Sequence, residues 1–233
     1  MKIWLDAGHG GNDSGAVGFG LKEKDLNLII VKKIGKLLES YQNVDVRYSR
    51  VDDRFLELLE RTKKANEAGA DYFCSIHINA TPSGTGFESF IYNDASSKSV
   101  AYQNIIHAEI MKQLDVKDRG KKRANYVVIR ETKMPAILTE NLFIDNQNDN
   151  KKLKEDGFLD KIAQGHVNGF VKSFGLKEKP KPITTQKYTI RSGENLTKIA
   201  QREKTTVKEI MKLNPQIKDK NVVFPGQQIK IPK

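Results

Sequence analysis

The sequence predicts an α/β fold, a mostly parallel twisted sheet with helices on both faces, followed by a small α+β unit. Strand-like and helix-like patterns alternate through residues 1–176, which is typical of parallel strands joined by helices. A charged segment with two prolines interrupts this pattern at residues 177–186. Beyond it, a short strand–helix–helix–strand pattern fills the rest of the chain.

Short apolar or alternating runs mark the strands of the large domain. Ile3-Trp4-Leu5 is an apolar run at the start of the chain, and residues 44–48 alternate between apolar and polar side chains. The strands are expected at residues 3–5, 44–48, 72–78, 89–92, 126–129 and 136–139.

Apolar residues three or four positions apart mark the helices between these strands. Leu26, Ile30 and Ile34 show this spacing in the first helical segment. The helices are expected at residues 24–40, 54–68, 97–114 and 158–174.

The C-terminal part predicts a separate small domain. Residues 177–186 have no apolar period, so we expect an extended linker there. Strands are then expected at 188–190 and 228–231, with helices at 195–203 and 206–213 between them. The expected domains are therefore 1–176 and 187–233, joined by the linker.

The positive charge is concentrated in this C-terminal part. Residues 177–233 hold 14 Lys and Arg against 5 Asp and Glu, whereas residues 1–176 hold 26 against 24. A basic module beside a near-neutral one favours attraction to a polyanion. Nucleic acid is disfavoured as that partner, because no aromatic residues alternate with the lysines to stack on bases. An anionic bacterial wall or membrane surface remains as the candidate partner of the basic module.

Composition also bears on the compartment and on covalent catalysis. No apolar run of signal length precedes the first strand, so we expect no signal peptide, and no run is long enough to span a membrane. The single cysteine, Cys74, lies in an apolar strand, which favours a packed thiol over a reactive nucleophile. His107 and His166 lie within helices and are expected at the surface or the edge of the core.

Four polar residues lie at or near the carboxyl ends of expected strands, where open α/β sheets bind ligands. These residues are His9, Glu23, His77 and Glu140. Two imidazoles and a carboxylate form a known catalytic zinc set, and a second carboxylate is a suitable base. Spacing alone leaves a second interpretation open, in which the histidines are hydrogen-bonded structural groups and Glu23 belongs to a solvated charge run. Glu140 is harder to assign to structure, because it follows residues expected to be buried.

The large domain resembles the zinc-dependent N-acetylmuramoyl-L-alanine amidases. The matching segments are 5–15 (LDAGHGGNDSG), 20–28 (GLKEKDLNL), 49–52 (SRVD), 61–66 (RTKKAN), 75–80 (SIHINA) and 139–146 (TENLFIDN). The resemblance implies that His9, Glu23 and His77 bind zinc and that Glu140 is the catalytic glutamate. The family usually has Gly or Ala where Leu142 stands, so we expect a change at the pocket floor.

The implied reaction is hydrolysis of the amide between the lactyl group of N-acetylmuramic acid and L-alanine. Zinc would polarise the lactyl carbonyl, while Glu140 would take a proton from water and deliver one to the leaving amine. Asn79 is left with two roles, hydrogen bonding to substrate or bracing a turn.

The C-terminal domain resembles one LysM domain, a family that binds N-acetylglucosamine-containing glycans of peptidoglycan. The matching segments are 188–196 (YTIRSGENL), 199–200 (IA), 213–215 (LNP) and 225–232 (PGQQIKIP). By position, the glycan groove would be lined by Gly193, Glu194, Asn195, Leu196, Thr197, Asn214, Pro215 and Ile217. The excess of Lys and Arg would add attraction to anionic wall polymers.

Two rival functions remain at this point. One is a wall-binding protein without activity, which the complete set of two histidines and two glutamates disfavours. The other is a zinc peptidase that cuts within the stem peptide. We expect a monomer that acts on the wall after release, either as a phage lysin or as a mother-cell lytic enzyme of a sporulating bacterium.

Overall fold

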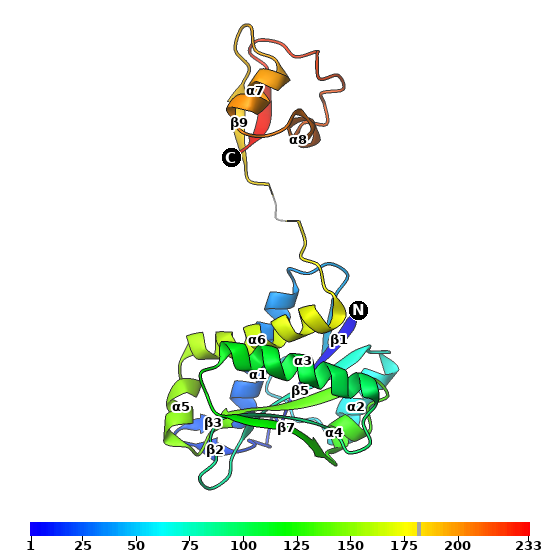
Figure 1. Ribbon diagram of the computed structural model, residues 1–233, viewed down its shortest axis with the longest axis vertical. Helices are drawn as coiled ribbons and strands as arrows, with labels where there is room; N and C mark the ends of the chain where they lie inside the picture. The colour runs from blue at the N-terminus through cyan, green and yellow to red at the C-terminus, as the bar shows by residue number, and fades with distance from the viewer. Residues whose placement is uncertain (181–182) are drawn as a thin grey trace. The chain divides into compact units, whose positions relative to one another are not determined.

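The computed structural model describes residues 1–180 and 183–233, which form two compact units, Met1–Lys179 and Pro180–Lys233 (Figure 1). Two residues of the expected linker, 181 and 182, lie outside the described residues. At the linker's start, the backbone of Lys177 and Lys179 hydrogen-bonds to residues 40–42. At its end, strand β9 begins at Thr185.

A six-stranded sheet forms the centre of the larger unit. In the order β4-β1-β5-β8-β6-β7, neighbouring strands are parallel except for β8 and β6, which are antiparallel. The bounds are β1 Lys2–Ala7, β4 Asp45–Tyr48, β5 Tyr72–Asn79, β6 Phe87–Tyr92, β7 Asp118–Ala124 and β8 Ala136–Phe143. A separate small hairpin pairs β2 (Val17–Gly18) with β3 (Leu21–Lys22). The predicted mostly parallel sheet is confirmed.

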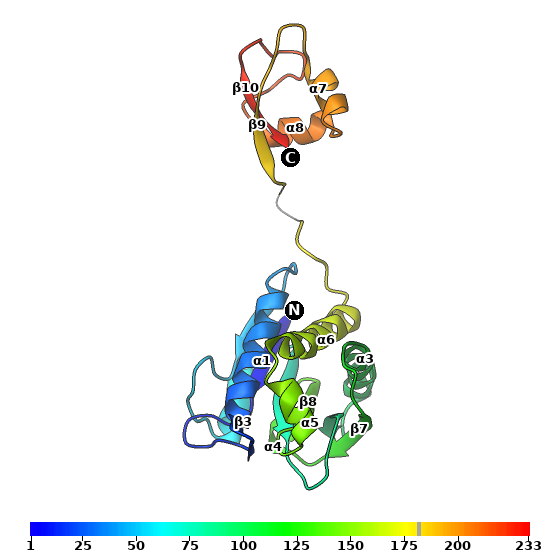
Figure 2. The ribbon, with the colours of Figure 1, turned by 90° about the vertical axis from the view of Figure 1, so that its left-hand side faces the viewer.

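Helices cover both faces of this sheet, as predicted. One face packs against α1 (Glu23–Leu38), α3 (Ser97–Gln113) and α6 (Asp156–Phe174), with α6 between the other two (Figure 2). The other face packs against α2 (Leu58–Glu67) and α4 (Val127–Arg130). A short helix, α5 (Gln147–Leu153), follows β8.

The alternation of side chains along the strands explains the two cores. In β1, Ile3 and Leu5 join the larger core beneath α1 and α6, whereas Trp4 joins the smaller core beneath α2 and α4. Successive side chains of a strand point to opposite faces, so a strand covered on both sides is apolar throughout. This is why the short run Ile3-Trp4-Leu5 marked a central strand.

The predicted strand at residues 126–129 is wrong. Residues 127–130 form helix α4, and the edge strand is β7, whose sequence DRGKKRA has almost no apolar residues. Period alone does not separate a short buried helix from a buried strand. Val128 and Ile129 are buried because they turn toward the sheet from α4. An edge strand with partly exposed side chains needs no apolar alternation.

The C-terminal unit has the predicted strand–helix–helix–strand order. Its elements are β9 Thr185–Thr189, α7 Leu196–Arg202, α8 Val207–Leu213 and β10 Gln228–Pro232. The two strands pair antiparallel, and the unit has its own small core that includes Ile190, Ile199 and Ile229. Across the described parts of the chain, no helix combines the length and the apolar character needed to cross a bilayer.

Candidate metal centre

Two histidines and a glutamate meet at the carboxyl ends of the central strands. His9 lies in the turn after β1, Glu23 is the first residue of α1, and His77 lies in β5. One ligand atom from each residue lies within 4.8 Å of the others. The sequence predicted that these three side chains come together, and the structure brings them together.

The Glu23 carboxylate is at the centre of this group. His77 Nδ1 lies 2.9 Å from Oε1, and His9 Nε2 lies 3.2 Å from Oε2. Backbone amides of Ala16 and Ile78 also donate to the two oxygens. Burial alone would raise the pKa of Glu23, but hydrogen bonds from His77 and His9 hold it well below its ordinary value. Glu23 is therefore a carboxylate, the form that binds a metal.

Asp13 orients the His9 ring. Its Oδ2 lies 2.8 Å from His9 Nδ1, which leaves Nε2 facing Glu23. Burial opposes a charge on His9, yet hydrogen bonds to Glu23 and Asp13 raise its pKa. A carboxylate on the far nitrogen of a ligand histidine is a common second partner in zinc sites. Asp13 belonged to a sequence motif, but no role was predicted for it; its spacing of four residues from His9 is the signal that would have found it.

Glycines make room for these side chains. A Cβ on Gly8 would overlap the His77 ring, and a Cβ on Gly15 would lie 2.6 Å from both Glu23 and His9. Gly15 also has a φ of 60°, which disfavours any other residue there. The donors fit a catalytic zinc ion, which takes two imidazoles and a carboxylate and leaves a fourth position open.

Two buried arginines hold the turn that carries His9. Arg50 donates to the carbonyl oxygens of Ala7 and Gly8, and Arg61 donates to those of Ala7 and His9. Arg61 also pairs with the buried Asp6 at 2.9 Å. Both arginines belong to segments that carried the family resemblance, and their role here is to satisfy the backbone of this turn.

Glu140 lies beside His77. The two residues are paired in register on the parallel strands β8 and β5. Both strands continue past these residues, so neither residue ends its strand as the sequence had predicted. The Oε2 atom of Glu140 is buried and has no hydrogen-bond partner among the described residues. Burial, followed by the charges of Glu23 and Glu88, raises the pKa of Glu140 well above its ordinary value.

A pocket opens over this pair. It has a volume of about 350 Å³ and is lined by His77, Glu140, Leu58, Leu138 and residues 125–128. A second pocket of about 210 Å³ lies on the His9 side and shares Leu58, His77 and Val128 with the first. The two pockets together form a groove lined by His9, His77 and Glu140, and the walls of this groove are largely apolar.

The contacts bear on three other expectations. Leu142 is fully buried in the larger core with a φ of 73°, so the predicted change at the pocket floor is wrong. A left-handed backbone favours glycine at this place, because glycine has no Cβ. Cys74 is buried as expected, and burial raises the pKa of its thiol. Asn79 donates to Glu88 Oε1 and accepts from the Ala80 amide, which braces the end of β5.

His107 and His166 are both buried, so the surface placement that the sequence allowed is wrong. His107 bridges Ser89 and Asp118, and His166 bridges Thr139 and the carbonyl of Ile162. Helical periodicity did not show this, because the imidazoles face the sheet and exchange hydrogen bonds with its polar side chains. They lie outside the metal cluster.

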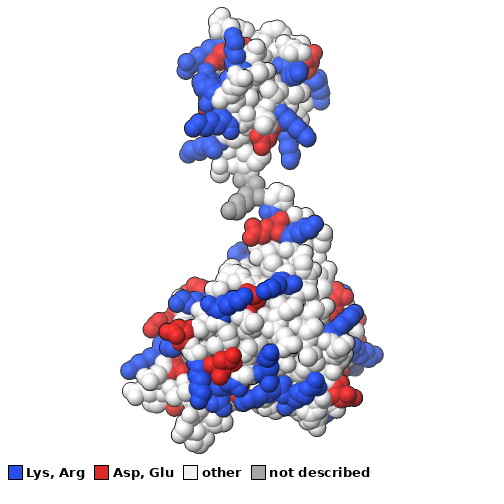
Figure 3. Space-filling model, in the orientation of Figure 1, with Lys and Arg blue, Asp and Glu red and all other residues white. Residues whose placement is uncertain are grey.

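The residues expected to bind glycan fall into two groups. Leu196, Asn214 and Ile217 are buried, and the Asn214 amide ties Ile210 to Lys230. Gly193, Asn195, Thr197 and Pro215 are exposed, and Glu194 accepts from the Tyr188 hydroxyl. A pocket of about 340 Å³ includes Asn214 and Pro215 but not residues 193–197. Lys and Arg side chains are prominent on the visible face of this unit (Figure 3).

Sequence profiles of two families match the chain. The N-acetylmuramoyl-L-alanine amidase profile matches residues 3–172, and the LysM domain profile matches residues 188–232.

Several named proteins are similar to the larger unit. N-acetylmuramoyl-L-alanine amidase CwlM of Bacillus licheniformis is 50% identical over 179 residues, which cover 76% of this chain and 70% of that protein. The Endolysin of Bacillus phage SPP1 is 50% identical over 182 residues, covering 76% and 67%. The sporulation-specific N-acetylmuramoyl-L-alanine amidase of Bacillus subtilis is 48% identical over 179 residues, covering 76% and 70%.

Solved structures of N-acetylmuramoyl-L-alanine amidases are also similar to the larger unit. The catalytic domain of CwlV, an N-acetylmuramoyl-L-alanine amidase from Bacillus (Paenibacillus) polymyxa, superposes with a TM-score of 0.72 at 35% identity. That match covers 76% of this chain and 99% of that structure. The N-acetylmuramoyl-L-alanine amidase from Clostridium difficile 630 gives a TM-score of 0.73 at 35% identity, covering 75% and 96%.

Proposed function

Since this chain belongs to the N-acetylmuramoyl-L-alanine amidase family, we propose that His9, Glu23 and His77 hold a zinc ion and that Glu140 is the general base. The chain is a peptidoglycan hydrolase with a C-terminal LysM domain. The observation that carries the proposal is the convergence of the three ligand atoms within 4.8 Å, with Glu140 in register beside His77.

The donor set selects the metal. Two imidazole nitrogens and one carboxylate favour a catalytic zinc ion over calcium or magnesium, which prefer oxygen ligands. Zinc, when bound, supplies a Lewis acid that polarises an amide carbonyl and makes water more acidic. Asp13 keeps the His9 ring in position, and Gly8 and Gly15 leave room for the ligands.

Glu140 is suited to move the proton. Its buried Oε2 lacks a protein donor and is therefore available to a water molecule in the pocket. Its raised pKa brings the carboxylate closer to the range in which a base works at neutral pH. As water adds to the lactyl carbonyl, Glu140 takes its proton and then gives it to the alanine nitrogen as the C–N bond breaks. The products are a muramoyl carboxylate and a free amino terminus on alanine.

We propose separate roles for the three parts of the chain. Residues 1–176 are the catalytic domain, 177–186 the linker and 187–233 the LysM domain, whose ligand is an N-acetylglucosamine-containing glycan. Gly193, Asn195, Thr197 and Pro215 offer exposed surface to that glycan, while Leu196, Asn214 and Ile217 shape it from within. Glu194 is half-buried and accepts from the Tyr188 hydroxyl. We propose that Asn79, at the end of β5, also contacts the substrate.

The setting is proposed from the relatives. The names Endolysin and sporulation-specific amidase suggest lysis of a host cell or of a mother cell. The excess of Lys and Arg after residue 176 adds attraction to anionic wall polymers, and we propose that the chain acts as a monomer.

End-group analysis of digested peptidoglycan tests the function. We expect new amino-terminal alanine without new reducing sugar ends, and the loss of this activity on zinc chelation with recovery on adding zinc back. New amino termini on other residues would instead indicate a peptidase that cuts within the stem peptide. Wall binding without any release would indicate a binding protein.

A further inference from the structure

A row of polar side chains continues from the metal centre to the edge of the sheet. His77 on β5 pairs with Glu140 on β8, and Glu140 pairs directly with Glu88 on β6. Directly paired residues of neighbouring strands point to the same face. The next strand, β7, places Arg119 and Lys122 against Glu88. The row therefore ends in two cations.

Glu88 is buried and fully engaged. It is 3% exposed, and its Oε2 accepts from Lys122 Nζ and from Arg119 Nε, the latter at 2.8 Å. Its Oε1 accepts from the Asn79 amide at 2.7 Å. One carboxylate thus accepts from two cations at the edge of the sheet. Neutralising Glu88 would need only one of them.

Arg119 retains free hydrogen-bonding capacity. Its guanidinium lies 4.7 Å from the centre of the Phe143 ring, and its side chain is 27% exposed. Within residues 1–180 and 183–233, no partner is found for Nη1 or Nη2. These two nitrogens form the fork with which arginine binds a carboxylate through two parallel hydrogen bonds. Lys122, 38% exposed, adds a second cation at the same place.

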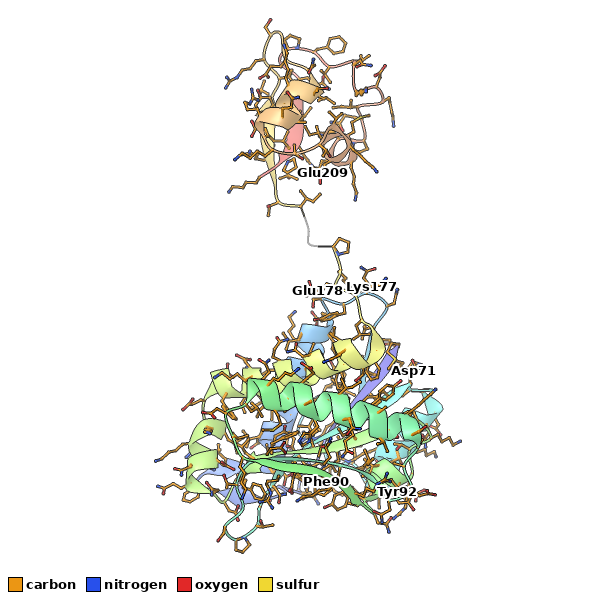
Figure 4. All side chains as sticks on the ribbon, viewed as in Figure 1. Asp71, Phe90, Tyr92, Lys177, Glu178 and Glu209 are labelled. Atoms are coloured by element: carbon orange, nitrogen blue, oxygen red, sulfur yellow. The ribbon has the colours of Figure 1, made fainter. Side chains whose placement is uncertain are left out.

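Aromatic side chains connect the cations to the pocket that contains Glu140, although neither cation lines that pocket. Tyr126 lines the pocket over Glu140, and its ring lies 5.4 Å from that of Phe90. Lys122 Nζ approaches the same Phe90 ring at 5.7 Å. Phe90 lies on the side of the sheet opposite α3 and α6 (Figure 4). The same face of the sheet therefore carries both the reacting groups and the two cations.

We propose that Arg119 and Lys122, held in place by Glu88, form a subsite that binds a carboxylate of the stem peptide. The inference rests on the proposed function. The carboxyl group of the muramoyl unit is consumed in the scissile amide, so a carboxylate at this subsite comes from the peptide side. Two strand spacings of about 4.8 Å separate β8 from β7, or about 10 Å. An extended peptide covers that distance in about three residues, which places the carboxylate on the second or third residue.

Two synthetic substrates test this subsite directly. Both are N-acetylmuramoyl-L-Ala-D-Glu-L-Lys peptides, one with its free carboxylates and one with each carboxylate converted to a carboxamide. We expect Arg119→Gln to lower kcat/KM on the carboxylate substrate about ten-fold or more, mainly through KM, because a charged hydrogen bond is lost. On the carboxamide substrate, Arg119→Gln and the unchanged protein should give the same rate.

A matched control comes from the same strand. Arg123 donates to the carbonyl oxygens of Tyr92 and Asn93 and does not contact Glu88. Arg123→Gln removes the same charge from β7, and we expect neither substrate to be affected. Lys122→Gln, which leaves Arg119 on Glu88, should show the same preference with a smaller loss and gives a second test if Arg119→Gln does not fold.

The outcomes separate this inference from the proposed function. If Arg119→Gln and Lys122→Gln lose activity equally on both substrates, or on neither, the subsite is refuted while the amidase activity stands. If the unchanged protein cuts the muramoyl–alanine bond in neither substrate, the proposed function itself fails.

Discussion

At the scale of single residues, the proposed metal centre depends on close packing as much as on its donors. The His77 ring lies where a side chain on Gly8 would be, and the Glu23 carboxylate lies where one on Gly15 would be. Asp13 fixes the His9 ring from the other side. A side chain added at Gly8 or Gly15 would therefore displace His77, His9 or Glu23.

Gly8→Ala should weaken zinc binding by about 10–100-fold, because the new methyl group overlaps the His77 ring. Titration with zinc in the presence of a competing chelator measures this directly. Gly157→Ala is the matched control, since a methyl group at Gly157 would meet no atom within 4 Å. Unchanged zinc affinity in Gly8→Ala would show that the ring does not occupy this place.

A second residue-scale feature is the buried His166, whose pKa is lowered to about 4 by burial. The unfolded chain binds a proton near pH 6.5, so between pH 6.5 and pH 4 the unfolded state holds more protons than the folded state. Stability is therefore greatest above pH 6.5 and falls as the pH decreases toward 4, by up to about 3 kcal/mol.

His166→Gln should remove this part of the pH dependence while keeping a side chain that can hydrogen-bond to Thr139. Urea unfolding of the amidase unit at several pH values gives the comparison. Equal slopes for the two proteins between pH 6.5 and pH 4 would rule out His166 as the source.

At the scale of elements, α2 is attached to the end of β1 through one side chain. Arg61 donates from α2 to Asp6 and to the carbonyl oxygens of Ala7 and His9. Burial opposes ionisation of Asp6, but Arg61 and the hydroxyls of Ser49 and Ser75 lower its pKa. The position of His9 thus depends on a helix far along the chain.

Arg61→Met should destabilise the amidase unit by about 3–5 kcal/mol, because it leaves Asp6 buried and unpaired. Lys64→Met on the same helix removes an exposed cation and should change stability by less than about 0.5 kcal/mol. Thermal or urea unfolding distinguishes them, and similar stability for both variants would contradict the role given to Arg61.

The elements also show what a sequence can predict. Central strands and long helices were predictable, because burial on both faces leaves a continuous apolar run in a strand and burial of one stripe leaves an apolar period in a helix. The three residues of the proposed metal site were predictable because each lies in a recognisable motif at or near the end of a predicted strand or the start of a predicted helix. Strand β7 and helix α4 were not, since an edge strand can be polar and a single helical turn has no period of its own. Glu88 was missed because a glutamate in a strand suggests solvent, and its cations come from that unrecognised strand.

At the scale of the whole molecule, the two units divide the work. Each has its own hydrophobic core, and the formal charge is +2 for residues 1–176 but +9 for residues 177–233. A tethered binding domain raises the local concentration of substrate without changing the catalytic groups. Its charge adds a long-range attraction that salt screens.

Ending the chain after Lys179 should leave kcat on a soluble muramoyl peptide unchanged and weaken binding to purified walls. Binding of the full chain should decrease with added salt more steeply than that of the truncated one. Sedimentation with walls at several salt concentrations measures both. Equal wall binding by the two proteins would contradict a binding role for the second unit.

The central claim is that zinc binding and proton transfer belong to different side chains. The direct measurement is zinc content together with turnover of a muramoyl peptide for Glu140→Gln and the unchanged protein. We predict one zinc ion per chain in both, with turnover lowered about 10²–10⁴-fold in the variant. Turnover close to that of the unchanged protein, or loss of zinc from Glu140→Gln, would contradict the assignment.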